Sequence, residues 1–167
     1  MLTHRDAKNR PAMVDVGGKP VTKRTAHAVA VVSLPAQLAA RLKNGDIATQ
    51  KGMIFQTAVL AGVMGAKKTS EIIPLCHPLP IEDCKIDIKP AKGGREVSIH
   101  CRVQTHAKTG VEMEALTGAT VAALTLYDMA KSISHGIVLK EVRLLAKTGG
   151  KQDYRAPHDL SRRRRLE

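Results

Sequence analysis

The sequence predicts an α+β fold of the split βαβ, ferredoxin-like kind, with helices packed on one face of an antiparallel sheet. Three observations predict it. Strand-like and helix-like segments alternate along the chain in the order β-α(α)-β-β-α-β. Gly93-Gly94 joins two alternating segments, which is typical of a β-hairpin. Residues 115–127 have helical character and no charge, with small and apolar residues all round, so we expect this helix to be covered on several sides and the chain to be oligomeric.

Three regions are expected along the chain. Residues 1–25 are polar and contain prolines and a Gly-Gly pair, which predicts a partly mobile N-terminal arm. Residues 26–151 form a single catalytic α+β domain. Residues 152–167 form a basic, disordered tail ending near four consecutive arginines.

The first half of the domain predicts one strand and two helices. Residues 26–34 are rich in valine and predict the first strand. A helix follows from about Pro35, with Leu34, Leu38 and Leu42 on one face, and Asn44-Gly45 ends it. A second helix covers residues 54–72. Pro74 ends it, and the prolines around residues 75–79 make the next loop stiff.

The alternating segments 81–89 and 95–104 predict a hairpin with a fixed register. A turn at Gly93-Gly94 places Ile86 opposite Cys101 and Cys84 opposite Val103 on an apolar face. Cys84 and Cys101 are therefore expected to be core thiols and not a disulfide. The other face, with residues such as Lys85 and Arg102, is expected to be polar and wet.

The central helix is expected over residues 110–134, capped near Thr109. Glu112 and Glu114 lie in its first turn, where the helix dipole favours negative charge. Asp128 and Lys131 lie three residues apart near its end and are neighbours on one face. Gly136 ends this region, and residues 137–146 predict the last strand.

Composition narrows the class of function. The chain has 167 residues and a formal net charge of +12, more than half of which lies in residues 1–25 and 151–167. Aromatic residues make up 2% of the chain, so few side chains are available to stack on nucleic-acid bases. The charge of the domain itself suits a small anionic ligand at least as well as a polymer.

The sequence also indicates the cellular compartment of the protein and whether a metal site is expected. The sequence contains no apolar run of 18 residues, so no membrane span is expected. Its three cysteines, without a Cys-x-x-Cys pair, suit a reduced cytoplasm. The seven histidines are scattered, so no metal site is expected.

Polar residues at the ends of the predicted elements are the candidates for chemistry. Taken singly, each has an ordinary structural explanation, since most lysines are solvated and most single histidines are structural. Together they combine cations for phosphate with groups for acid–base chemistry, which an anionic, phosphorylated substrate requires. The set comprises Lys51, His77, Glu112, Glu114, Asp128, Lys131 and Lys147.

Several blocks of the chain closely resemble the molybdenum cofactor biosynthesis protein C family, whose activity is cyclic pyranopterin monophosphate synthesis. The resemblance covers about residues 13–151, with the blocks in the family's order. These blocks are Met13–Val16, Lys51-Gly52, Ile73–Leu79, Lys108–Thr117, Tyr127–Met129 with Lys131, and Val142–Lys147.

The resemblance implies an enzyme, a phosphorus–oxygen lyase. Its substrate would be (8S)-3′,8-cyclo-7,8-dihydroguanosine 5′-triphosphate, rearranged to cyclic pyranopterin monophosphate with loss of diphosphate in molybdopterin synthesis. It further implies a ferredoxin-like subunit, a homohexamer built as a trimer of dimers, and active sites at subunit interfaces. No cofactor is expected, although Mg²⁺ could accompany the triphosphate.

The resemblance also assigns roles to single residues. Asp128 would be catalytic with Lys131 beside it, and Lys51 and Lys147 would act in phosphate binding or proton transfer. Glu112 would position the substrate. The remaining substrate-binding residues would be Leu75, Cys76, His77, Met113 and Glu114.

Two other classes of function fit the sequence less well. A basic nucleic-acid-binding module on a ferredoxin-like sheet would need exposed aromatic residues on its central strands, and residues 81–104 contain none. A non-catalytic oligomeric scaffold would explain the apolar helix but not the set of lysines, histidine and carboxylates.

Overall fold

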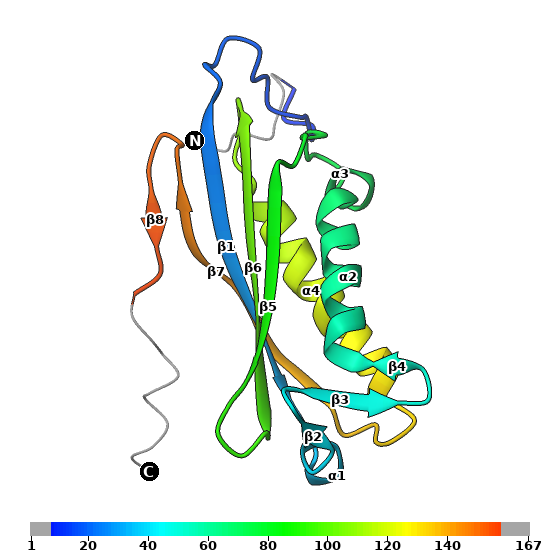
Figure 1. The fold of residues 1–167 in the computed structure, drawn as a ribbon. Coiled ribbons are helices and arrows are strands. Elements are labelled where there is room, and N and C mark those ends of the chain that lie inside the picture. The colour runs from blue at the N-terminus through cyan, green and yellow to red at the C-terminus, as the bar shows by residue number, and fades with distance from the viewer. Residues whose placement is uncertain (1–7, 158–167) are drawn as a thin grey trace.

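The computed structural model describes residues 8–157 of the chain. An antiparallel sheet carries two long helices on one face, and a small second sheet lies near one end (Figure 1). Along the chain the elements are β1 (Thr22–Ser33), α1 (Ala36–Ala39), β2 (Leu42–Lys43), β3 (Asp46–Thr49), β4 (Gly52–Met53), α2 (Ile54–Lys67), α3 (Thr69–Ile72), β5 (Asp83–Pro90), β6 (Glu96–Ala107), α4 (Glu112–Ala130), β7 (Val138–Thr148) and β8 (Tyr154–Arg155).

The large sheet has the strand order β5-β6-β1-β7-β8, and every neighbouring pair in it is antiparallel. Its four long strands therefore lie in the order expected for a split βαβ unit, which is compatible with the ferredoxin-like plan. The fold is α+β, with α2 and α4 packed on the same face of the sheet, as the sequence predicts (Figure 1). Strand β5 forms one edge of the sheet.

The core lies between the sheet and the two long helices. Alternate residues of β1 and β6, among them Ala28 and Ile99, face α4 and are fully buried. Small residues let α2 and α4 approach closely: a Cβ added at Gly62 would lie 2.8 Å from the backbone oxygen of Gly118. The close contact fixes α4, whose two ends carry the candidate residues.

The β5–β6 hairpin has the predicted register. Cys84 pairs with Val103 and Ile86 pairs with Cys101. Both glycines of the turn have positive φ, 86° for Gly93 and 66° for Gly94, a conformation that glycine adopts without strain. Cys84 and Cys101 are free thiols on the apolar face, as expected.

The segment after β1 differs from the prediction. The expected helix is a single turn, α1, and Leu42 lies in β2. Asn44 and Gly45 have φ of 52° and 82° and form the two-residue turn between β2 and β3. Two consecutive positive φ angles define the tight turn of a hairpin, whereas a helix end needs only one.

Other element ends also differ from the expected ones. The second helix breaks at Lys68, so that α3 is separate. α4 begins at Glu112 after Val111, and no side chain, that of Thr109 included, caps it. Strand β1 begins within the segment assigned to the arm, and β8 lies within the segment assigned to the tail. Residues 1–7 and 158–167, including the arginine run, lie outside the described residues.

Among residues 8–157, no helix is both long enough and apolar enough to cross a membrane.

Candidate functional site

The predicted site residues form two groups at opposite ends of α4. Glu112, Met113 and Glu114 lie in the first turn of this 19-residue helix, whereas Asp128 and Lys131 lie at its end. With a rise of 1.5 Å per residue, Met113 and Asp128 are about 22 Å apart along the helix axis. One protomer therefore does not bring all ten predicted residues together.

The group at the end of α4, called here the lysine–aspartate cluster, consists of Lys51, Asp128 and Lys131. Lys131 Nζ lies 2.6 Å from Asp128 Oδ1, and Lys51 Nζ lies 3.9 Å from Asp128 Oδ2. About half or more of each of these side chains is exposed. In a single protomer this cluster is thus a solvent-exposed network of ion pairs. Opposite charges three residues apart on a helix ordinarily form such pairs without any catalytic role.

Charge within the cluster favours the ionised forms. The hydrogen bond and the positive charge of Lys131, together with the charge of Lys51, hold the pKa of Asp128 below its usual value. The same hydrogen bond and the Asp128 charge raise the pKa of Lys131. Proton transfer by either group requires a change of surroundings that opposes this mutual stabilisation.

The group at the start of α4 lines a cavity of about 400 Å³, called here the carboxylate pocket. It joins the first turn of α4 to the stiff loop after α3 and to the N-terminal arm. All the substrate-binding residues predicted by sequence, except Lys147, line it. The lining includes Val14, Lys19, Leu75, Cys76, His77, Leu79, Thr109, Gly110, Glu112, Met113, Glu114 and Lys151.

His77 is held in this pocket by the arm and by its own loop. Its Nε2 lies 2.9 Å from the carbonyl oxygen of Val14, which only accepts hydrogen bonds, so Nε2 carries the proton. In the neutral ring, Nδ1 is then the hydrogen-bond acceptor.

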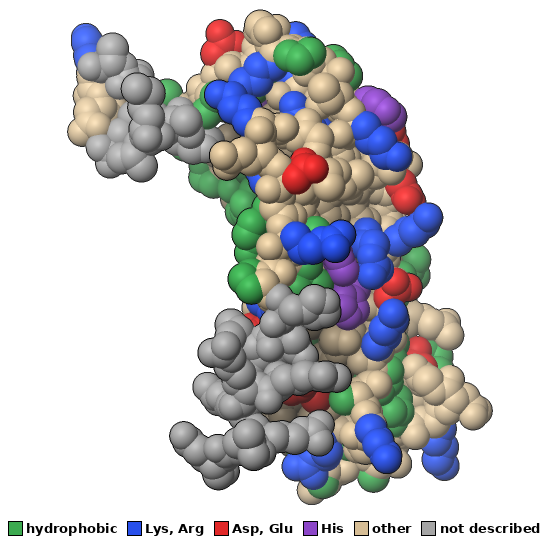
Figure 2. Space-filling view, turned by 90° about the vertical axis from the view of Figure 1, so that its left-hand side faces the viewer, with side chains coloured by type: hydrophobic (Ala, Val, Ile, Leu, Met, Phe, Trp, Pro, Cys, Tyr) green, Lys and Arg blue, Asp and Glu red, His purple; other side chains and the backbone are tan. Residues whose placement is uncertain are grey.

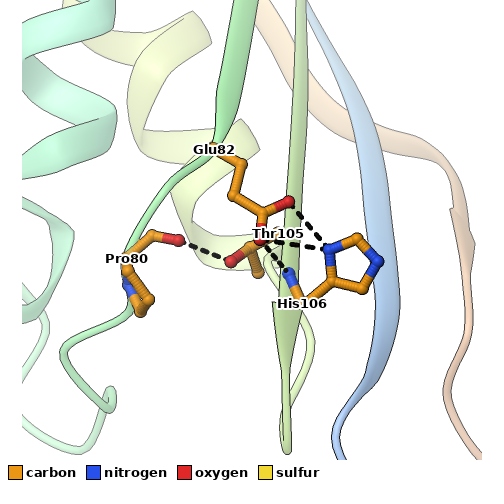
Figure 3. Close-up of polar contacts among 4 residues, drawn as sticks. All are labelled: Pro80, Glu82, Thr105 and His106. Atoms are coloured by element: carbon orange, nitrogen blue, oxygen red, sulfur yellow. Dashed lines mark hydrogen bonds and ion pairs between the residues drawn. The ribbon is translucent and has the colours of Figure 1, made fainter.

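The loop that carries His77 is anchored to β6 (Figure 3). The hydroxyl of Thr105 donates to the carbonyl oxygen of Pro80, and Glu82 Oε2 lies 2.9 Å from Nδ1 of His106. Two strand residues thus fix the end of a loop whose prolines already restrict it.

Glu114 is the buried carboxyl group of the pocket, with 4% of its surface exposed. Burial, with a smaller contribution from the charge of Glu112, raises its pKa above the usual value. Cys76 lies in the same pocket, and burial together with the Glu114 charge raises the pKa of its thiol. A carboxyl group that holds its proton more tightly can donate a hydrogen bond or a proton to a bound molecule.

Next to this pocket lies a strongly basic cavity of about 510 Å³, called here the basic cavity. Glu112 belongs to both linings and forms an ion pair of 3.0 Å with Lys147. Among the described residues, five cationic side chains and one acidic side chain, that of Glu112, line the basic cavity, which favours a polyanionic ligand. The cations are Lys19, Arg24, Lys108, Lys147 and Lys151.

Sequence reasoning identified Lys147 but missed the other four cations of this cavity. One signal was available for Arg24. Along β1, Arg24 alternates in phase with the buried residues Ala26 and Ala28, so it points to the helix-bearing face just beyond the core. Its guanidinium group donates to the carbonyl oxygens of Ala107 and Lys108. Lys19 and Lys151 lie in irregular segments, where no periodicity shows direction.

The open face of the sheet argues against a polymer ligand (Figure 2). Basic and acidic side chains are interspersed there. Arg102 pairs with Asp87 at 2.8 Å, Lys85 with Asp83 at 3.3 Å and Arg143 with Glu141 at 3.0 Å. Such compensated charge gives little attraction for a phosphate backbone.

Within the described residues, no group of three or more His, Cys, Asp or Glu side chains is placed to hold a metal ion.

Comparison with known proteins identifies relatives over most of the chain. A family model described as the MoaC family matches residues 13–150. The chain is 51% identical over 152 residues to a cyclic pyranopterin monophosphate synthase of Xanthomonas oryzae pv. oryzae, covering 91% of this chain and 92% of that protein. It is 48% identical over 156 residues to a molybdenum cofactor biosynthesis bifunctional protein of Synechocystis, covering 92% of this chain and 45% of that protein. It is 45% identical over 153 residues to molybdenum cofactor biosynthesis protein 1 of Drosophila melanogaster, covering 92% of this chain and 27% of that protein.

Proposed function

Because this chain belongs to the MoaC family, we propose that it is a cyclic pyranopterin monophosphate synthase, an enzyme of molybdenum cofactor biosynthesis. It acts on a small molecule, the cyclised dihydro derivative of GTP, and releases diphosphate as a phosphorus–oxygen lyase. The observation that carries this proposal is the junction of the carboxylate pocket with the basic cavity through Glu112. Acid–base groups thus lie directly beside cations, as a purine-derived triphosphate requires.

The two cavities divide the work of binding. The triphosphate occupies the basic cavity, where Lys147 and Arg24 neutralise its charge. The purine-derived part occupies the carboxylate pocket beside His77 and Glu114. Leu75, Cys76 and Met113 belong to the apolar part of this pocket's lining.

The lysine–aspartate cluster completes the site from a second copy of the chain. In one protomer it lies about 22 Å along α4 from the carboxylate pocket. At a contact between copies, the cluster can face the pocket of its neighbour and lose its water. Asp128 and Lys131 then exchange protons with the substrate, and Lys51 supplies charge beside them.

The exposed side chains support self-association. Leu60 and Met64 on α2 and Leu124 on α4 are each more than half exposed, an apolar group that water does not favour. The assembly proposed is a homohexamer, a trimer of dimers. We further propose that it works in the cytoplasm, which its three free cysteines suit, without a resident cofactor, with Mg²⁺ possible on the triphosphate.

Mixing two inactive variants tests the shared site. Asp128→Asn and Lys147→Gln should each abolish diphosphate release from the cyclised GTP derivative. Because the two residues come from different copies, co-expression should restore about a quarter of the normal activity, the share of sites with both native residues. Asp87→Asn and Lys140→Gln, which alter similar exposed ion pairs elsewhere, are the matched controls and should remain active.

Two results contradict the proposal. Full activity in either single variant would remove the role assigned to that residue. Inactive singles whose mixed oligomers stay inactive would show that one copy supplies both residues, against the shared site.

A further inference from the structure

Lys51 lies at the tip of a hairpin, and its ion pair with Asp128 restrains it only weakly. The β3–β4 hairpin turns at residues 50 and 51, and 60% of the Lys51 side chain is exposed. Its Nζ lies 3.9 Å from Asp128 Oδ2, and an exposed pair at this distance contributes little to stability. The position of Lys51 therefore depends on the hairpin, whose turn the Thr49 hydroxyl also holds by accepting from the Lys51 N–H at 3.2 Å and donating to the Gly52 carbonyl oxygen at 2.9 Å.

A buried carboxylate ties the base of this hairpin to a helix. Asp46, at the start of β3, is 7% exposed. Its Oδ1 accepts hydrogen bonds from the backbone N–H groups of Ile47 at 2.6 Å and Phe55 at 2.8 Å. Its Oδ2 accepts from the N–H of Gln56 at 3.2 Å.

These contacts replace the missing cap of α2. Met53 occupies the N-cap position, and its side chain makes no hydrogen bond to the free N–H groups of the first turn. Phe55 and Gln56 are the second and third residues of the helix, whose N–H groups an N-cap side chain normally binds. Asp46 binds both from seven residues before Met53, and its negative charge lies at the positive end of the helix dipole.

The cap from outside the helix has a second effect. It closes the chain from Asp46 to Phe55 into a loop whose ends cannot separate. Ile47 and Ile54, next to the two ends, are fully buried in the core. Lys51 is thus carried on a short hairpin with both ends fixed.

We propose that Asp46 is a positioning residue for the reaction, holding the Lys51 turn beside the Asp128 carboxylate by capping α2 from β3. The inference rests on the role of Lys51 in the proposed function. It separates two roles of one side chain: stabilising α2, and placing Lys51.

A transplanted cap distinguishes these roles. Asp46→Ala should lower Tm and lower kcat/KM by about 10- to 100-fold, the size of effect expected when a reacting group is misplaced by about 1 Å. Adding Met53→Asp supplies a carboxylate at the N-cap itself and should restore Tm. It does not restore the tie to β3, so kcat/KM should stay low. Met53→Asp alone is the control. Recovery of kcat/KM together with Tm would overturn the proposal, leaving Asp46 only a structural role.

A second measurement does not depend on activity. The charge of Lys51 contributes to the lowered pKa of Asp128, which ¹³C NMR of the labelled carboxyl group can follow. Asp46→Ala should raise this pKa to the value found in Lys51→Gln, and the double variant should show no further rise. An Asp128 pKa unchanged by Asp46→Ala would overturn the proposal. If Lys51→Gln kept full activity, the proposed role of Lys51 would fail, while this pKa comparison would still decide whether Asp46 places Lys51.

Discussion

Replacing Gly62 by alanine tests the contact that holds α4 in place. An added Cβ would overlap Ile86 Cδ1 and would lie 2.8 Å from the backbone oxygen of Gly118 and 3.0 Å from Ala122 Cβ. The end of the Ile86 side chain can rotate away. The Gly118 carbonyl belongs to the backbone of α4, so α2 and α4 must move apart.

The expected loss of stability in Gly62→Ala follows from two opposing effects. Overpacking a close contact costs about 1–3 kcal/mol. Alanine in place of glycine inside a helix returns about 1 kcal/mol through its higher helix propensity. Because the Gly118 oxygen is a backbone atom, the overpacking cost lies in the upper part of this range, about 2–3 kcal/mol, and the free energy of unfolding should fall by about 1–2 kcal/mol.

Equilibrium urea unfolding at a fixed protein concentration measures this change. Gly18→Ala is the control, because an added Cβ there meets nothing within 4 Å, and its effect should be within about 0.5 kcal/mol. A Gly62→Ala variant as stable as the parent, or more stable, would refute the reasoning that this contact has no room.

Three further outcomes are expected. Burial, followed by the charges of Arg102 and His100, lowers the pKa of His27 from its usual 6.5 to about 4. Between about pH 4 and pH 6.5 the unfolded chain therefore binds more protons than the folded chain, so stability falls as the pH drops from about 6.5 towards 4. His27→Gln should reduce this loss of stability, measured by urea unfolding at pH 7 and pH 4.5. Burial and, after it, the charge of Glu114 raise the pKa of the Cys76 thiol, so Glu114→Gln should speed alkylation of Cys76 by iodoacetamide near neutral pH, read by peptide mass spectrometry, and an unchanged rate would contradict the contribution of that charge. Thr105→Val removes the hydroxyl that binds the Pro80 carbonyl and should cost about 1 kcal/mol on thermal unfolding, whereas an equally stable variant would show that the loop does not depend on it.

Local pattern was sufficient for the four long strands of the large sheet and for the long helices, but not for β8. The register of the β5–β6 hairpin followed from Gly93-Gly94 and the alternation around it, since a slip by one residue would expose the whole apolar face. The burial of α4 was predicted from the absence of charge over residues 115–127, and Gly118 and Ala122 are among its buried residues.

Tertiary context decided the rest. Asn44-Gly45 suits a helix end and a hairpin turn equally, because both require positive φ. The choice is made by long-range partners: Asp46 binds the start of α2, and Ile47 enters the core. By contrast, the separation of the lysine–aspartate cluster from the carboxylate pocket follows from the sequence alone, because both groups have residues on the helix predicted over residues 110–134 and each residue adds 1.5 Å along its axis.

The edge of the sheet at β5 has a consequence for how the chain meets its neighbours. Its open-face side chains are Asp83, Lys85, Asp87 and Lys89, of alternating sign, and Pro90 ends the strand without an N–H to donate. A foreign strand docking here would have to strip water from four ions and would find one backbone donor missing. The β5 edge therefore disfavours edge-to-edge β-sheet aggregation between molecules, even at high protein concentration.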